Sequence, residues 1–319
     1  MSDDLYRARQ VLIWLAIATH AVIYGLTFAV GMRLNYQSLL PFIAWLGGVL
    51  AFTIAYCRWR SMPRLHNIVE PAIIGTLLSI AILISTYLAM LPSMPLADEK
   101  LAQIDAMFGF HWWTFVHFVD GLPWLAAFLS FAYQSFTIQL FMLPILLGSI
   151  GQAKRAYWMM SSYALIGLCA AIVAVWFPAV GAFPHNQIGP ENLENINIFY
   201  GYFFLEQFHG VRDNPNFVFD INDAAGIITF PSVHAAVAAL CAWAAWNVRP
   251  VRYPVMLLNV GMAVSAVSHG SHYLVDALAG VPLAFVCIAL ASALTRLVPE
   301  KQQKAKAGAI VGAGLESPG

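Results

Sequence analysis

Long apolar runs separated by short polar segments dominate the sequence. A membrane helix needs about 20 apolar residues to cross the hydrocarbon core of a bilayer. Runs of roughly that length cover residues 11–31, 39–57, 69–92, 125–150, 157–179, 231–248, 251–269 and 272–296. The pattern predicts an all-α, polytopic membrane helix bundle with about eight transmembrane helices.

Two segments depart from this simple alternation. Residues 108–150 are too long for one helix, and 111–123 is typical of an interfacial helix that ends before the fourth span, because Trp favours that depth. Residues 180–230 form a long polar segment with many aromatic residues, which predicts an ordered lid. We therefore divide the chain into three N-terminal spans (1–107), a membrane core with its loop (108–296) and a cytoplasmic tail (297–319).

Composition indicates a membrane protein, and the distribution of charged residues predicts its orientation in the membrane. The chain is 60% hydrophobic and 10% charged, with a formal net charge of zero. A soluble domain carries about 25% charged residues, and nothing in this balance points to a nucleic-acid partner. With eight spans, thirteen Lys and Arg residues fall on one side and only Arg33, Lys100 and Arg212 on the other. The positive-inside rule then places both termini in the cytoplasm, most simply at the plasma (inner) membrane.

The first chemical motif opens the sixth span on the predicted outer side. Pro231 suits the first turn of a helix, and Ser232 with the next backbone amide, that of Val233, would face an incoming anion. A helix N-terminus carries free N–H donors and a partial positive charge, which favours phosphate. His234 lies one turn further in, where it could donate a proton to a leaving oxygen.

The second motif opens the eighth span at the same depth. His272 and Asp276 are four residues apart, so a helix places them on one face within reach of each other. A carboxylate that accepts from one imidazole nitrogen fixes the tautomer and leaves the other nitrogen free to attack. Asp276 is also an ionisable residue inside a membrane helix, which is by default a functional candidate.

These residues resemble a known family. Pro231-Ser232-Val233-His234, followed by His272 and Asp276, is similar to the second and third motifs of the type 2 phosphatidic acid phosphatase superfamily. The surrounding sequence looks most like its inositol phosphorylceramide synthase branch. Over about residues 125–296, the resemblance implies a six-helix-type phosphatase core that needs no metal or other cofactor. It also implies that His272 forms a phosphohistidine, that Asp276 supports it, and that His234 protonates the leaving alcohol.

The sequence also departs from the family pattern. Ser265 and Ala266 occupy the third motif's Ser-Arg positions, so that arginine is absent, and His269 or Ser268 is the candidate replacement in phosphate binding. The first family motif has no literal match. Arg212, the lone cation of the long loop, is our substitute, because a guanidinium binds phosphate oxygens in a bidentate way. A site this poor in cations fits a phosphodiester or a monoanionic lipid phosphate.

The leading hypothesis is a lipid phosphate phosphatase or phosphotransferase that works on the extracytoplasmic face. Water as acceptor gives hydrolysis, and a lipid or polyol hydroxyl gives transfer. A transporter or non-catalytic membrane partner is the alternative, although transporters usually carry repeats and midplane sites. A zinc hydrolase using His234, His272 and Asp276 is a third possibility. Loss of activity on addition of a chelator would distinguish it from the metal-free enzyme.

Overall fold

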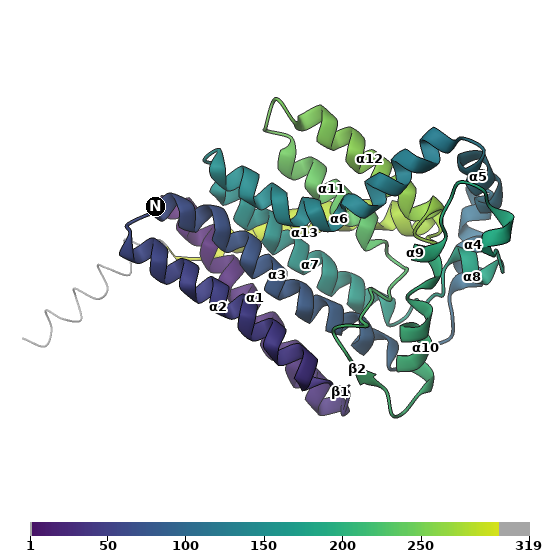
Figure 1. Ribbon diagram of the computed structural model, residues 1–319, viewed down its shortest axis with the longest axis horizontal. Coiled ribbons are helices and arrows are strands. Elements are labelled where there is room, and N and C mark those ends of the chain that lie inside the picture. Colours follow the sequence, from purple (N-terminus) through teal and green to yellow (C-terminus); the bar gives the residue numbers. More distant parts are fainter. Residues whose placement is uncertain (1, 300–319) are drawn as a thin grey trace, which may run out of the picture.

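A computed structural model describes residues 2–299 and shows a helical bundle (Figure 1). Most of the predicted cytoplasmic tail, 297–319, lies outside the described residues. The long helices are α1 (Asp3–Val30), α2 (Tyr36–Trp59), α3 (Pro63–Met90), α6 (Pro123–Ser149), α7 (Ala153–Ala174), α11 (Val233–Ala245), α12 (Arg252–Ser268) and α13 (Leu274–Leu297). The short elements are α4 (Asp98–Met107), α5 (Trp112–Asp120), α8 (Ala182–His185), η1 (Pro190–Asn192), α9 (Phe199–Tyr202), α10 (Leu205–Asp213), β1 (Arg33–Leu34) and β2 (Val218–Phe219).

Six of the described helices are long and apolar enough to cross a membrane: α1, α2, α3, α6, α7 and α13. The fold is thus the predicted polytopic helical bundle of an integral membrane protein. At 13 and 17 residues, α11 and α12 are shorter. At 1.5 Å per residue, α11 spans about 20 Å of a hydrocarbon core about 30 Å thick. The count of eight spans therefore stays a prediction.

Local sequence signals explain where the helices begin and end. Ser2 caps α1 by accepting from the Leu5 N–H at 3.4 Å, and α1 stops at Gly31, whose φ of 71° is left-handed. The predicted break before the fourth span is present, because α5 ends before Gly121 and Pro123 begins α6 at a position where proline costs no hydrogen bond.

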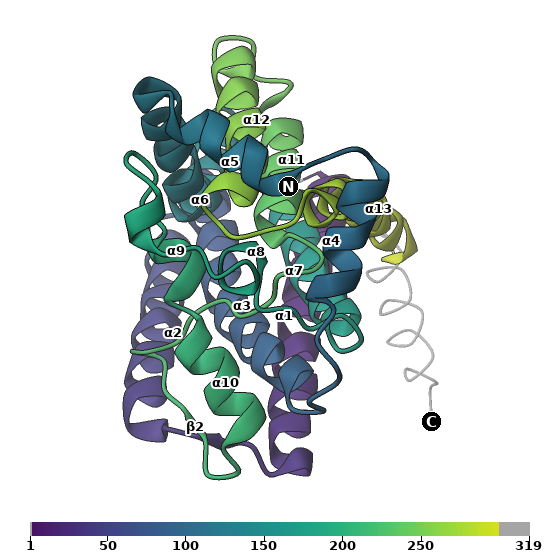
Figure 2. The same cartoon turned by 90° about the vertical axis from the view of Figure 1, so that its right-hand side faces the viewer.

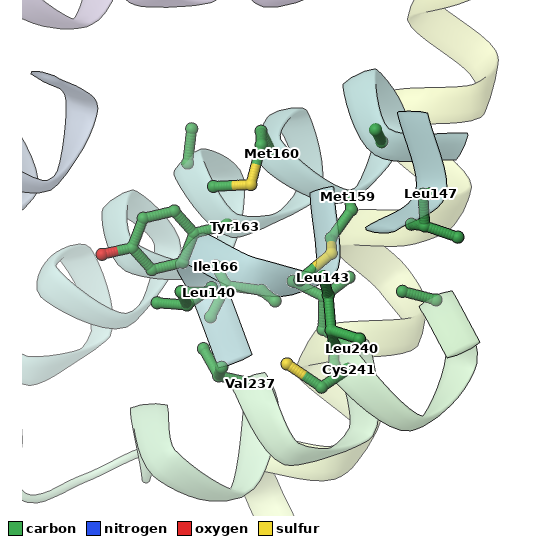
Figure 3. Close-up of a cluster of buried hydrophobic side chains, with 14 of the residues drawn as sticks. Leu140, Leu143, Leu147, Met159, Met160, Tyr163, Ile166, Val237, Leu240 and Cys241 are labelled. Carbon is green, nitrogen blue, oxygen red and sulfur yellow. The ribbon is translucent and has the colours of Figure 1, made fainter. Parts of the chain in front are cut away.

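The centre of the bundle is packed by α6, α7 and α11 (Figure 3). Lipid tails are as apolar as the side chains, so helix association depends on close packing rather than on the hydrophobic effect. Small residues provide that packing between α3 and α7. A Cβ on Gly75 would collide with Met160, and one on Gly167 would collide with Ile82.

The short helices α4, α5, α8, α9 and α10 gather at one end of the bundle, opposite the N-terminus in Figure 1 and toward the viewer in Figure 2. The predicted lid, residues 180–230, is ordered into α8, η1, α9, α10 and β2, and β2 pairs in parallel with β1. Asp120 holds one part of this lid by accepting backbone N–H bonds from Glu194, Asn195 and Ile196 at 2.8–2.9 Å. Burial raises the pKa of Asp120, but the three donors more than offset it, so the pKa lies below its ordinary value.

Candidate active site

The first turns of α11 and α13 meet at one point. The Ser232 N–H donates to the Asp276 carbonyl at 3.0 Å, while the Ser232 side chain accepts from the Ala235 N–H at 3.3 Å and caps α11. Gly280 of α13 packs so closely on the Ser232 carbonyl that a Cβ there would collide with it. The two motifs predicted to act together are thus in direct contact, although 37 residues, 235–271, lie between them along the chain.

His272 and Asp276 form a buried pair at the start of α13. The distance from His272 Nδ1 to Asp276 Oδ2 is 3.2 Å, and the Tyr273 N–H donates to the same oxygen at 2.9 Å. The two residues are 5% and 0% exposed. A carboxylate at Nδ1 holds the proton on that nitrogen and leaves the Nε2 lone pair free. Asp276 Oδ1 has no hydrogen-bond partner among the described residues, so the pair is not fully satisfied.

His234 lies across from this pair, with its ring centroid 6.4 Å from that of His272. Two aromatic rings of α6 hold it. Tyr133 stacks on it at 4.2 Å with an interplanar angle of 10°, and Phe136 lies at 4.6 Å. The lid residue Tyr200 contacts Tyr133 in turn, at 5.1 Å between centroids. The orientation of His234 therefore depends on α6 and the lid as well as on its own helix.

Two buried carboxylates of α4 position the segments beside the pair, and sequence reasoning missed both. Asp105 accepts from the backbone N–H groups of Leu274 and Val275 at 2.7 and 2.8 Å, capping α13. Asp98 accepts from the Tyr273 hydroxyl at 3.0 Å and from two backbone N–H groups of the lid at 2.9 and 3.0 Å. Their spacing of seven residues, two turns on one helix face, was the available signal.

His234 and His272 line a cavity of about 630 Å³ that extends between the long helices. Val233 and the lid residues Gly226 and Ile228 also line it. The other lining residues come from α2, α3, α6 and α7: Trp45, Leu46, Val49, Ile73, Gly75, Thr76, Ser79, Ile82, Leu83, Thr86, Phe136, Thr137, Leu140, Phe141, Met160, Tyr163 and Gly167. The wall is mostly apolar, and none of these lining residues is Lys or Arg.

The four predicted phosphate-binding residues fall in different places. Val233 lines the cavity and Ser232 caps α11, whereas neither His269 nor Arg212 is among the lining residues. His269 is buried with Nδ1 2.9 Å from the Ser268 hydroxyl. The Arg212 guanidinium donates to the Met94 carbonyl at 2.8 Å. The structure thus brings the three predicted catalytic residues together and leaves Arg212 apart from their cavity.

The fold and this site define a class: a polytopic helical membrane protein with a His–Asp pair whose histidine lines an apolar cavity together with a second histidine. The chain belongs to the PAP2 superfamily, which its sequence matches over residues 99–290 of 319. No curated protein and no solved structure matches it. The match includes both motifs and all of α4 except Asp98, and it begins after α1, α2 and α3.

Proposed function

We propose that the protein is a membrane phosphatase or phosphotransferase for lipid phosphates that works through a phosphohistidine on His272. PAP2 membership supports a phosphoric ester substrate. The observation that carries the proposal is the buried His272–Asp276 pair facing His234 across one cavity.

The first step transfers the phosphoryl group to the protein. His272 Nε2 attacks phosphorus, the bond from phosphorus to the ester oxygen breaks, and His234 donates its proton to that oxygen as the alcohol leaves. Asp276 stabilises the positive charge that develops on the His272 ring. Attack and proton donation each need about 3 Å between heavy atoms, so the 6.4 Å between the two ring centroids fits a phosphoryl group between them.

The second step resolves the phosphohistidine. His234, now neutral, takes a proton from an incoming hydroxyl group, whose oxygen attacks phosphorus as the bond to Nε2 breaks. Water as the acceptor yields inorganic phosphate, and a lipid or polyol hydroxyl yields a new ester. The likeness of the motifs to the inositol phosphorylceramide synthase branch favours transfer.

The cavity supports a lipid as the substrate. Its wall is apolar, so it suits a hydrocarbon chain, with the phosphate held at the end where the two histidines lie. A site without lining Lys or Arg residues favours a phosphate group of low charge. We place this site on the extracytoplasmic face and both termini in the cytoplasm, on the distribution of basic residues.

The test follows phosphate release from a lipid phosphate by the purified protein, with EDTA present, beside His272→Ala. Parallel reactions contain diacylglycerol, ceramide or an inositol lipid as acceptor. Phosphate release by the wild type but not by His272→Ala supports hydrolysis. Appearance of the phosphate on the added acceptor supports transfer. A wild-type protein that turns over no phosphate ester would overturn the proposal, and inhibition by EDTA would favour a metal mechanism.

A further inference from the structure

A second pocket, of about 540 Å³, lies at the opposite end of the bundle from the short helices. It is formed by α1, the end of α2 and the start of α3, beside the N-terminus in Figure 1. Its lining residues are Arg9, Cys57, Arg58, Ser61, Pro63, Arg64, His66 and Asn67. Along α3, the pocket is lined by residues 63–67 and the cavity that holds His234 and His272 is lined only from Ile73 onward. The two share no lining residue, so we treat the pocket as a separate site.

The positive charge of Arg9 is already balanced. Glu70, which is 1% exposed, accepts from Arg9 Nε and Nη2 at 2.6 and 2.7 Å. The Tyr157 hydroxyl donates to Glu70 at 2.6 Å, and His66 Nε2 lies 3.3 Å from it. One arginine, one tyrosine and one histidine thus occupy both oxygens of the carboxylate, which leaves it no capacity for a further cation.

Arg58 and Arg64 line the same pocket without any such balance. Within residues 2–299, neither makes an ion pair, a hydrogen bond or a ring contact through its side chain, and no Asp or Glu lines the pocket. Two like charges held at one pocket repel each other. Both arginines are exposed, so an incoming anion can reach them, and an anion bound by both would remove that cost. Ser61 and Asn67, which also line the pocket, offer neutral donors.

The level of the pocket in the bilayer indicates which kind of anion it would bind. Trp59 follows Arg58 directly and is 77% exposed, and Tyr56, one turn earlier on α2, is 37% exposed. Exposed Trp and Tyr at the end of a membrane helix mark the level of the lipid headgroups. Basic pockets between membrane helices at that level bind anionic headgroups.

We propose that this pocket binds the phosphate group of an anionic lipid, with Arg58 and Arg64 as its direct ligands. The bound lipid connects α2 to α3 at their turn and stabilises the folded bundle increasingly as its concentration rises above its Kd. This proposal is independent of the chemistry at His272.

The test measures binding of phosphatidylglycerol to the purified full-length protein in an uncharged detergent, by native mass spectrometry, with phosphatidylcholine as the neutral lipid. The variant is Arg58→Gln/Arg64→Gln. The matched control is Arg60→Gln, because Arg60 lies on the same turn, packs over the Trp59 ring at 5.6 Å and does not line the pocket. At about 1 kcal/mol for each basic residue, the double variant should bind phosphatidylglycerol about 30-fold more weakly.

Equal retention of phosphatidylglycerol by wild type and double variant, or an equal loss in Arg60→Gln, would overturn the proposal. Unchanged melting temperatures in phosphatidylcholine establish that the variants are folded. A second arm titrates inorganic phosphate alone. One outcome is that inorganic phosphate binds the wild type but not the double variant and displaces phosphatidylglycerol at equal concentration. That result would assign the pocket to a soluble phosphate and overturn the lipid assignment.

Discussion

At the residue scale, the two histidines differ in their neighbours, and the roles we propose for them rest on this difference. His272 has a carboxylate at Nδ1 and can act as a nucleophile through Nε2. His234 is held by aromatic rings and has no carboxylate partner among the described residues. It can therefore gain and lose a proton without first breaking an ion pair, as an acid–base group must.

His234→Ala should slow the reaction in a way that depends on the leaving group. General acid catalysis contributes about 10²- to 10⁴-fold, and this contribution should be lost for an alkyl phosphate, whose alkoxide leaves poorly. An aryl phosphate such as 4-nitrophenyl phosphate needs no such protonation and should lose less than about 10-fold. Comparing kcat/KM for the two substrates checks this, and equal losses would contradict the acid role.

Asp276→Asn should separate activity from stability. The amide cannot hold the Nδ1–H tautomer of His272 as the carboxylate does, so turnover should fall about 100-fold or more. The substitution also removes a buried charge that has one unpartnered oxygen in the described structure, so the melting temperature should stay the same or rise. Both are measured on the same purified sample. Normal turnover would remove Asp276 from the site, and loss of folding would contradict the stability argument.

At the element scale, the site exists because α11 and α13 approach each other closely at their N-termini. Gly280 permits this approach, since any side chain there would meet the Ser232 backbone carbonyl, which cannot rotate away. The contact fixes the spacing between Ser232, His234 and the His272–Asp276 pair.

Gly280→Ala should therefore weaken both the fold and the site. Overpacking costs about 1–3 kcal/mol, and separating the helices should raise the distance between the two histidines and lower kcat. Gly25→Ala in α1 is the control, because a Cβ at Gly25 has no neighbour within 4 Å. Melting temperature and kcat are compared for the two variants. A Gly280→Ala protein as active as Gly25→Ala would show that the close approach is not needed.

The parts of the site that the sequence predicted are local, and those it did not predict are distant contacts. His272 and Asp276 were paired on helical spacing and are in contact, but α13 begins at Leu274 with Tyr273 as its N-cap, so His272 precedes the helix. The break between α5 and α6 follows from Gly121 and Pro123. Tyr133 reaches His234 across about a hundred residues of chain, so no local pattern marks it. Arg212 was chosen as the loop's lone cation, but charge along a sequence does not reveal that the Met94 carbonyl accepts from its guanidinium.

At the scale of the whole molecule, α2 and α3 complete the catalytic cavity even though they precede the matched region of the PAP2 superfamily. No role for the first three helices could be predicted from the sequence, because a cavity wall is formed by packing and has no sequence motif. The matched region carries His234 and the His272–Asp276 pair, and α2 and α3 enclose the cavity beside them.

This arrangement predicts that the α3 wall limits the length of the lipid chain. Thr76→Phe should fill part of the cavity and raise KM about 10-fold for a long-chain lipid phosphate, the effect of about 1.4 kcal/mol, while a short-chain ester keeps its wild-type KM. Leu77→Phe is the control, because Leu77 is the next residue of α3 and does not line the cavity. The same chain-length profile in all three proteins would contradict the prediction.

The most direct test of the central claim is to trap the phosphoryl group on His272. The wild-type protein is mixed with a lipid phosphate in EDTA, quenched in alkali within milliseconds and digested for mass spectrometry. The account predicts a phosphate on His272 that is stable in alkali and labile in acid, and that is absent from His272→Ala. In His234→Ala, the phosphohistidine should form from an aryl phosphate and should then be hydrolysed slowly. A wild-type enzyme that turns over its substrate while His272 stays unmodified at every time point would contradict it.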